Sequence, residues 1–381
     1  MSASVPTRRE AAPHRTSVLH RRPADRGRGE RGAIIILVLV TLLLASFLLT
    51  AFIKRSGTEL LADARASQLK GLRLEAYSAL ESTLAVLADY RNAQGALRSP
   101  VEPWGNALAD TGYVPSDGRE VEVTFEDESA KVSLPNATED ELQALLELSG
   151  VERNEAERFA RTLHAWMREA PKDASPSLDA PDYTRAEPAY KAAARPLRSW
   201  AELAAVELDR HVFFDEAGRP TAAYETFTRA ASLHAFSKVN LNSAPAETLT
   251  ALGLGDGELQ SLQNYRERPK PKGDPGYFRS LAEAGTVLGN SVQAEKFGTA
   301  IEVLRIHVTV RQGAIAYRLS AVIAASGNTR NTPPRREPTA ATPGATAQAT
   351  TPGPDRKVLN LPFSVLEIKE DAEPPLPPPA A

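Results

Sequence analysis

Residues 33–53, AIIILVLVTLLLASFLLTAFI, determine how this chain of 381 residues is organised. The run carries no charge and matches the roughly 20 residues that an α-helix needs to cross the hydrocarbon of a bilayer. The basic residues are unevenly spread around it. Two follow it, Lys54 and Arg55, and eight arginines precede it: Arg8, Arg9, Arg15, Arg21, Arg22, Arg26, Arg28 and Arg31. Because basic flanks stay cytoplasmic, this asymmetry predicts a cytoplasmic N-terminus and a C-terminal region on the outer, periplasmic side of the inner membrane.

The junction between the basic segment and the apolar run contains Gly32, which ends the string RGERG. It resembles the prepilin-peptidase site of type IV pilins and of the pseudopilins of type II secretion, in which a membrane protease cuts after such a glycine. The resemblance implies that Gly32 is the last leader residue and Ala33 the first mature residue. An ordinary signal anchor with a chance glycine is the alternative that the junction leaves open.

The fifth position after this junction is Leu37, where most pilin-like subunits carry a glutamate. A carboxylate is costly in lipid unless a partner neutralises it. In the family, that partner is thought to be the N-terminal amine of a neighbouring subunit, so an uncharged fifth position suits a subunit at the tip of a filament. This feature resembles general secretion pathway protein K.

Composition excludes some classes of protein. The net charge of -3 and the pI near 6.2 give no general affinity for nucleic acid, and a chain with no cysteine has no disulfide, thiolate nucleophile or cysteine metal site. Many of the 29 prolines fall late in the sequence. Residues 332–354 and 374–381 are therefore predicted to be flexible or polyproline segments that form no packed core.

A helical pattern continues beyond the apolar run. Leucines and alanines recur every three or four residues up to position 87, which predicts one helix, half in lipid and half amphipathic, that ends near Tyr90. The alternative is two helices that break near Ser56 and Gly57, because glycine costs a helix about 1 kcal/mol relative to alanine.

Residues 121–137, VEVTFEDESAKVSLPNA, alternate in polarity and then turn at Asp127. The alternation predicts a β-hairpin in which residues 131–134 form the second strand. The string resembles the protein K pattern of a strand, an acidic turn, a second strand and an asparagine. Pro135 stands where that family has leucine.

Residues 138–167 then take a helical period, with Thr138 and Glu141 as a capping box. In protein K this helix ends in an acidic run that binds calcium, whereas this chain keeps Trp166 and loses most of the acids. The acids that remain are spread through a proline-rich loop: Glu169, Asp173, Asp179 and Asp182. Since calcium needs several oxygen ligands close together, we expect a solvated loop and no cofactor.

Residues 238–268 predict two helices joined by a glycine turn at 253–255, and they resemble a helix-hairpin-helix unit. Such units often hold a DNA phosphate at the N-terminus of the second helix. Here Asp256 and Glu258 occupy that position and would repel phosphate, and Lys270 and Lys272 are the nearby basic pair. We therefore expect a packing module and no nucleic-acid partner.

Other helix starts and strands complete the predicted elements. Ser199 with Glu202 predicts one helix N-terminus, and residues 278–283 repeat the start of a helix that follows the hairpin in protein K. Residues 306–310 and 315–323 alternate around a turn at Gln312 and Gly313. Residues 358–368 predict a last strand that Pro362 limits to a sheet edge or a break.

No catalytic set is visible, so we expect no enzyme activity. The histidines lack metal-ligand spacing, and the chain has no P-loop, nucleophile elbow or zinc-protease motif. His307 is expected to be solvated, on the strand face opposite Ile306. The six histidines are His14, His20, His164, His211, His234 and His307.

The resemblance implies an α+β fold: a long N-terminal transmembrane and amphipathic helix and a pilin-like antiparallel sheet with a large inserted all-helical domain of helix-hairpin-helix (SAM-like) units. The predicted segments are a leader 1–32, a membrane helix 33–53, its periplasmic continuation 54–90, a first part of the head 91–136, the insert 137–300 with its hairpin unit at 238–285, sheet strands 301–326, a linker 327–356, a last strand 357–370 and a proline-rich tail 371–381.

By the same resemblance the chain is expected to be a minor pseudopilin of type II secretion that caps the pseudopilus. Its implied partners are other minor pseudopilins, the prepilin peptidase and the inner-membrane secretion platform. One alternative is a membrane-anchored helix-hairpin-helix DNA receptor of the competence type. Another is a membrane-anchored scaffold that prepilin peptidase does not cut.

Overall fold

The computed structural model describes residues 29–116, 118–168, 183, 189–206, 212–267, 275–289, 293–325 and 363–373, with backbone alone at 29–33, 325 and 372–373. The chain divides into two compact units, Met1–Ser67 and Gln68–Ala381. The predicted leader, except residues 29–32, the linker 327–356 and residues 374–381 of the tail lie outside the described residues.

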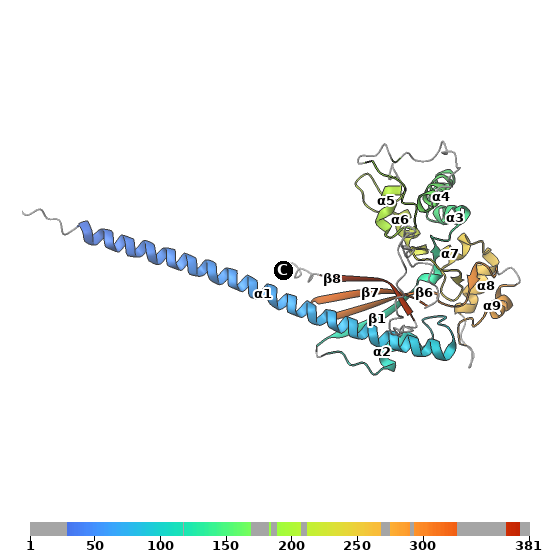
Figure 1. The fold of residues 1–381 in the computed structure, drawn as a ribbon, viewed down its shortest axis with the longest axis horizontal. Helices are drawn as coiled ribbons and strands as arrows, with labels where there is room; N and C mark the ends of the chain where they lie inside the picture. The colour runs from blue at the N-terminus through green and yellow to red at the C-terminus, as the bar shows by residue number, and fades with distance from the viewer. Residues whose placement is uncertain are drawn as a thin grey trace, which may run out of the picture. The chain divides into compact units, whose positions relative to one another are not determined.

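Helix α1, Gly29–Gln94, is continuous over 66 residues (Figure 1). The prediction of one helix is confirmed, and the alternative of a break at Ser56 and Gly57 is wrong, because an isolated glycine weakens a helix without ending it. The helix runs four residues past Tyr90 and stops at Gly95, whose φ of 78° suits glycine.

The second unit contains a four-stranded antiparallel sheet in the order β1-β6-β7-β8. The strands are β1 Glu120–Asp127, β6 Val303–Gln312, β7 Ile315–Ala325 and β8 Phe363–Glu373. The β6–β7 turn and the last strand are confirmed, with β8 at the edge and a register shift between Val322 and Ile323. Residues 68–94 of α1 pack on one face of the sheet, where alternate strand positions such as Ile306, Val308 and Leu319 are buried.

The predicted hairpin at residues 121–134 is wrong. Strand β1 pairs with β6 along its whole length, and β2, Val132–Ser133, pairs in parallel with β3, Ala231–Ser232. A 3-10 turn, η2 Glu128–Ala130, separates β1 from β2. The Asp127 side chain accepts a hydrogen bond from the Ser129 backbone N–H, and this cap redirects the chain away from β1.

The helices of the insert follow in chain order. They are α3 Glu139–Leu148, α4 Arg153–Met167, α5 Leu203–Val206, α6 Ala222–Ala230, α7 Ala246–Ala251, α8 Asp256–Glu267 and α9 Leu281–Leu288, with a 3-10 turn η4 Trp200–Glu202. The pattern at 138–167 therefore makes two helices, because Gly150 adopts a φ of 89° between them. Two more short elements, η1 Pro103–Asn106 and α2 Ala107–Asp110, precede the sheet.

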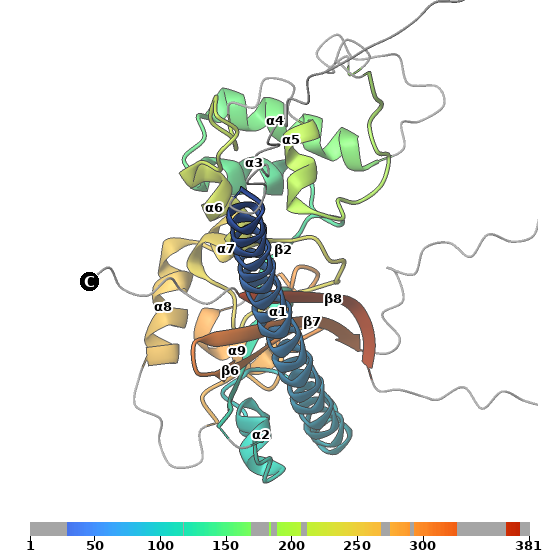
Figure 2. The same ribbon diagram turned by 90° about the vertical axis from the view of Figure 1, so that its left-hand side faces the viewer.

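The sequence predicted an all-helical insert, and this prediction is wrong. Within the insert, β4, Val239–Asn240, pairs in parallel with β5, Phe297–Gly298, and β3 pairs in parallel with β2, which precedes the insert. Figure 2 shows α3, α4, α5 and α6 in one group and α8 and α9 in another. One hydrophobic core spans both groups and includes Val303, Val322 and Ala324 of the sheet. The insert and the sheet thus share packing.

The predicted helix caps are confirmed. Thr138 and Glu141 form a reciprocal capping box, and Ser199 caps η4. The Ser280 side chain accepts a hydrogen bond from the Glu283 N–H at the start of α9. The residue types at these positions therefore set where the helices begin.

Candidate functional site

The apolar segment of α1 exposes its side chains. Between residues 34 and 53 the large apolar side chains are 49% to 69% exposed, with Leu37 at 65%. In the described part of the chain, α1 is the single helix long and apolar enough to cross a membrane. An uncovered apolar surface of this extent calls for an apolar environment.

The predicted processing residues lie at the beginning of this segment. The backbone is helical from Gly29, so Gly32 and Ala33 fall in the first turn or so of α1. Nothing more of their geometry lies within the described side chains, and the prediction that Gly32 precedes a cut stays a prediction.

Glu75 of α1 binds the loop before β1. Its carboxylate accepts hydrogen bonds from the Tyr113 hydroxyl at 2.6 Å and the Arg119 guanidinium at 2.8 Å, and from the Ser116 hydroxyl and backbone N–H. Burial by itself would raise the pKa of Glu75, but the bonds from Ser116, Tyr113 and Arg119 outweigh it and lower the pKa to about 2. The ionised carboxylate therefore holds Tyr113, Ser116 and Arg119 against the helix.

A second contact joins α1 to the edge strand β8. The Arg73 guanidinium donates two hydrogen bonds to the Glu370 carboxylate, at 2.8 and 2.9 Å, and the Tyr77 hydroxyl donates a third. The hydrogen bonds from Arg73 are the main cause that lowers the pKa of Glu370 to about 2. The pair is solvent-exposed, so its main effect is to set the position of β8.

A buried polar cluster joins the sheet to the insert. We call it the joint and define it as Asp127, Glu128, Asn240 and Arg305. The Asn240 amide donates to Asp127 Oδ2 at 2.7 Å, and Arg305 Nε donates to Glu128 Oε1 at 2.6 Å. Asn240 also donates to the backbone oxygen of Arg98 at 2.8 Å. Four segments far apart in sequence, around residues 98, 127, 240 and 305, thus meet at hydrogen-bonded polar groups.

The pKa values of the two acids of the joint shift in opposite directions. Burial raises the pKa of Asp127 to about 7, against the hydrogen bonds that it accepts. Burial also opposes ionisation of Glu128, but the nearby charges of Lys131 and Arg305 outweigh it and lower the pKa of that carboxyl. Glu128 is therefore a buried ion-pair member, and Asp127 is a carboxyl that titrates near neutral pH.

Sequence reasoning missed the joint. Asn240 and Asn242 lie in residues 238–268, the predicted hairpin unit, and their roles are structural. The Asn242 amide donates to the backbone oxygens of Phe278 and Thr299, and its own oxygen accepts from the Phe278 N–H. The sequence did contain a signal for these contacts, because two asparagines beside buried apolar residues need hydrogen-bond partners.

The predicted glycine turn lies between α7 and α8. Gly253 has a φ of 92°, and Glu258 accepts a hydrogen bond from the Gly255 N–H at 2.7 Å. The acidic side chain therefore occupies the helix N-terminus that would face a phosphate. Lys270 and Lys272 lie outside the described residues.

The region in which protein K carries its acidic run lies mostly outside the described residues, so the expectation of a solvated loop without calcium stays a prediction. After Trp166 come Met167 and Arg168, a thioether and a cation, and neither supplies an oxygen ligand from its side chain. Among the described residues, no group of three or more acids and histidines is placed to hold a metal ion. Glu169, Asp173, Asp179 and Asp182 lie outside the described residues. Aromatic contacts are present instead, since Trp166 meets Tyr183 edge to face with ring centroids 5.0 Å apart.

The described histidines occur singly, beside carboxylates. His164 lies 3.1 Å from Glu139, and His307 lies 3.3 Å from Glu126 and is 40% exposed. His307 is therefore half-exposed, as expected, with an added acidic neighbour. His234 is largely buried, 3.8 Å from a Glu367 oxygen. His14, His20 and His211 lie outside the described residues.

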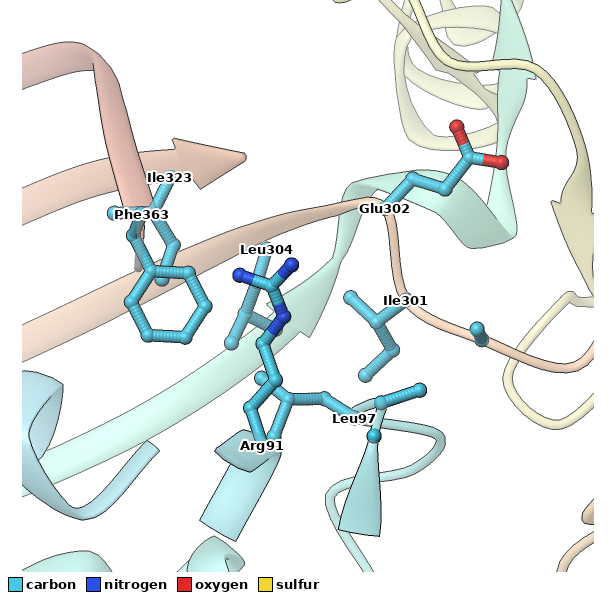
Figure 3. A pocket seen from close by; sticks show the side chains of 10 residues that line it. Arg91, Leu97, Ile301, Glu302, Leu304, Ile323 and Phe363 are labelled. Atoms are coloured by element: carbon cyan, nitrogen blue, oxygen red, sulfur yellow. The ribbon is translucent and has the colours of Figure 1, made fainter. Parts of the chain in front are cut away.

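One pocket of about 200 Å³ opens where α1 ends and β8 begins (Figure 3). Its walls are mainly apolar, and the Arg91 guanidinium points into it and lies 5.5 Å from the Phe363 ring centroid. The remaining lining residues are Gly95, Ala96, Leu97, Ala300, Ile301, Glu302, Leu304 and Ile323. The pocket is therefore an apolar hollow with one guanidinium in it.

The comparisons with known proteins agree with this architecture. Residues 120–213 match the first domain of type II secretion system (T2SS) protein K. The fold is similar to a chain in the crystal structure of the GspK-GspI-GspJ complex from the type 2 secretion system of enterotoxigenic Escherichia coli. That match has a TM-score of 0.54 and 16% identity, and it covers 81% of this chain and 98% of the other. No curated protein sequence gives a significant match.

The family match covers β1, Asp127 and Glu128 of the joint, and helices α3 to α5, and the fold match extends over most of the chain. Residues 120–213 are therefore similar to protein K of the type II secretion system, and the mixed helix and sheet fold is similar to that of a chain in the GspK complex.

Proposed function

We propose that this protein is a minor pseudopilin that caps the pseudopilus of a type II secretion system and helps to start its assembly. The proposal is based on one continuous helix, α1. Its first part is apolar and exposed, and its second part packs against the sheet. A helix of this kind anchors a subunit in the membrane and couples that anchor to the folded head.

The tip position rests on the insert and on Leu37. About 160 residues are added to the sheet at residues 137–300, and this bulk obstructs close stacking of identical heads. Leu37 cannot offer a carboxylate to the amine of a subunit above it. A subunit with both features is best placed where no further subunit follows.

We further propose that the N-terminus is cytoplasmic, that prepilin peptidase cuts after Gly32, and that the head is periplasmic, near the inner-membrane secretion platform. The arginines before residue 33 support the orientation. The protein is proposed to act as a structural subunit without enzymatic activity and without a tightly bound calcium ion.

The partners proposed for this chain are two smaller minor pseudopilins, by likeness to the complex of GspK with GspI and GspJ. Co-expression of the three proteins in one membrane, followed by detergent extraction and affinity purification of this chain, tests the assignment. We expect a complex with one copy of each. Recovery of this chain alone, with both smaller proteins present in the extract, would contradict the tip role.

A membrane-anchored DNA receptor is not favoured. The helix N-terminus that would hold a phosphate carries Asp256 and Glu258. An acidic surface repels the DNA backbone. Salt-sensitive binding of duplex DNA by the purified protein would revive this alternative.

A further inference from the structure

Strands β7 and β8 are neighbours in the sheet (Figure 1), but a long segment of sequence separates them. Their register pairs Ala325, the last residue of β7, with Phe363, the first residue of β8. Antiparallel strands whose ends meet in this way need a loop of about two to five residues. Strands β6 and β7 are joined by Gly313 and Ala314, whereas residues 326–362 stand between β7 and β8. The sheet therefore does not require so long a connection.

The side chains of β8 bury little surface. None of those described, at positions 363–371, is fully buried, and Val365 and Ile368 are 53% and 45% exposed. Leu366 packs partly against the core of the insert. In β7, by contrast, Leu319 and Ile323 are each 1% exposed. Because apolar burial supplies most of the free energy that holds an element in place, β8 should detach at a lower cost than β7.

The polar contacts of β8 outside the strand ladder are weak ones. The ion pair of Glu370 with Arg73 is solvent-exposed, and such pairs contribute about 1 kcal/mol or less. The contact of Glu367 with Arg305 is long, at 3.4 Å. A register shift interrupts the pairing of β8 with β7 midway. The backbone ladder to β7 is therefore the main attachment of β8.

A detached β8 would leave β7 with an unpaired edge, which can accept another strand. This structure shows which strand fits that edge, namely β8 with its own register and its own contacts to Arg73 and Arg305. A second copy of the chain carries the identical strand, so every contact made within one chain can also be made between two. Extended, residues 326–362 reach up to about 120 Å, which is ample for a neighbouring copy.

We propose that β8 is an exchangeable strand. It pairs with β7 of its own chain in this structure, and it pairs with β7 of a second copy when two chains lie side by side in the membrane. The inference does not depend on the tip position, since it follows from the strand register, the shallow burial of β8 and the length of residues 326–362.

The two ways of pairing compete. Pairing within one chain is favoured in dilute protein, because the connection keeps β8 at a high effective concentration near its own β7. Pairing between copies makes the same contacts and gains when copies are concentrated. We therefore expect exchange where chains accumulate in the membrane and closed single chains elsewhere.

The test uses single cysteines in the full chain, which has none of its own. Ser320 of β7 lies opposite Lys369 of β8, and opposed side chains in an antiparallel pair are close enough for a disulfide. One copy carries Ser320→Cys, and a second copy with a different affinity tag carries Lys369→Cys. The two are co-expressed, and their membranes are oxidised mildly with copper phenanthroline in air. We expect a mixed dimer joined through positions 320 and 369, identified by mass spectrometry, whose yield increases with time because each disulfide traps an exchanged pair.

The matched control is the other edge of the same sheet, where Thr124 of β1 lies opposite His307 of β6. Strand β1 continues directly into η2, so it has no long connection on that side. Copies with Thr124→Cys and His307→Cys should give at least tenfold less mixed dimer. A chain that carries both Ser320→Cys and Lys369→Cys should form the disulfide within itself, which checks the register.

A shortened variant tests the role of the connection. Replacing residues 326–362 with Asn-Gly, a two-residue hairpin turn, makes β8 follow β7 directly. This variant should keep the disulfide within one chain and should lose the mixed dimer at least tenfold.

Several results would overturn the proposal. The first is the absence of a 320–369 mixed dimer when the chain with both cysteines closes on itself. The second is an equal yield from the Thr124 and His307 pair, which would mean random collisions in the membrane. A mixed dimer that persists in the Asn-Gly variant, or a failure of the chain with both cysteines to close, would contradict the tethered strand itself.

Discussion

Replacing Glu75 with glutamine tests whether the head is fixed to α1 by an ionised carboxylate. The pKa of about 2 against an ordinary value of 4.5 is a difference of about 2.5 pH units. At about 1.4 kcal/mol for each pH unit, the ionised group contributes about 3 kcal/mol to folding at pH 7. Glutamine keeps one acceptor oxygen but places a donor against Ser116 or Arg119, so we expect a loss of about 2–3 kcal/mol.

The pH dependence gives a second, independent readout. A lowered folded-state pKa contributes stability that is complete above pH 4.5 and is lost as the pH falls towards 2. The Glu75 contribution should therefore decrease by about 2 kcal/mol between pH 5 and pH 3 in the wild type and not in Glu75→Gln. Urea unfolding of the full chain in detergent, followed by tryptophan fluorescence, measures both effects.

The matched control is Glu81→Gln on the exposed side of the same helix, for which we expect a change within about 0.5 kcal/mol. The reasoning is refuted if Glu75→Gln unfolds at the same urea concentration as the wild type. It is also refuted if the two variants lose equal stability, or if the wild type and Glu75→Gln respond identically to pH.

The remaining predictions concern the loop after α1 and the joint. Gly105→Ala should lower the free energy of unfolding in urea by more than about 2 kcal/mol, because an added Cβ would lie 1.9 Å from the backbone oxygen of Pro100. A change below about 0.5 kcal/mol would contradict this close approach. Asn240→Ala should lower the free energy of unfolding by about 2–4 kcal/mol, since it removes buried hydrogen bonds to Asp127 Oδ2 and to the backbone oxygen of Arg98. Asn240→Ser keeps a donor and should lower it less. The pKa of Asp127 is raised from its ordinary value of 3.8 to about 7, so its contribution to stability is complete below pH 3.8 and is lost as the pH rises from there to 7. Between pH 6 and pH 8 the wild type should therefore lose about 1 kcal/mol more than Asp127→Asn, and equal losses would contradict the raised pKa.

The elements with a strong local pattern were predictable from the sequence. The apolar run and the leucine period predicted α1, and the capping box of Thr138 and Glu141 predicted the start of α3. Strands β6 and β7 followed from strict alternation around Gly313. In each case the decisive contacts are between residues close in sequence, so the local pattern is enough.

The rest depends on contacts between distant segments. The partner of β1 is β6, about 180 residues later, and alternation in β1 does not identify it, so a nearby hairpin was predicted in error. The joint brings residues 127, 240 and 305 together, and its polar residues have no periodic signature. The pocket likewise combines the end of α1 with Phe363, which only tertiary structure brings near each other.

Mass spectrometry of the protein's N-terminus, after extraction from the membrane of its native host, tests most directly whether this chain is a processed pseudopilin. Our account predicts a mature chain that begins at Ala33, with residues 1–32 removed. A chain that retains the arginine-rich segment, or one cut at another position, would contradict it.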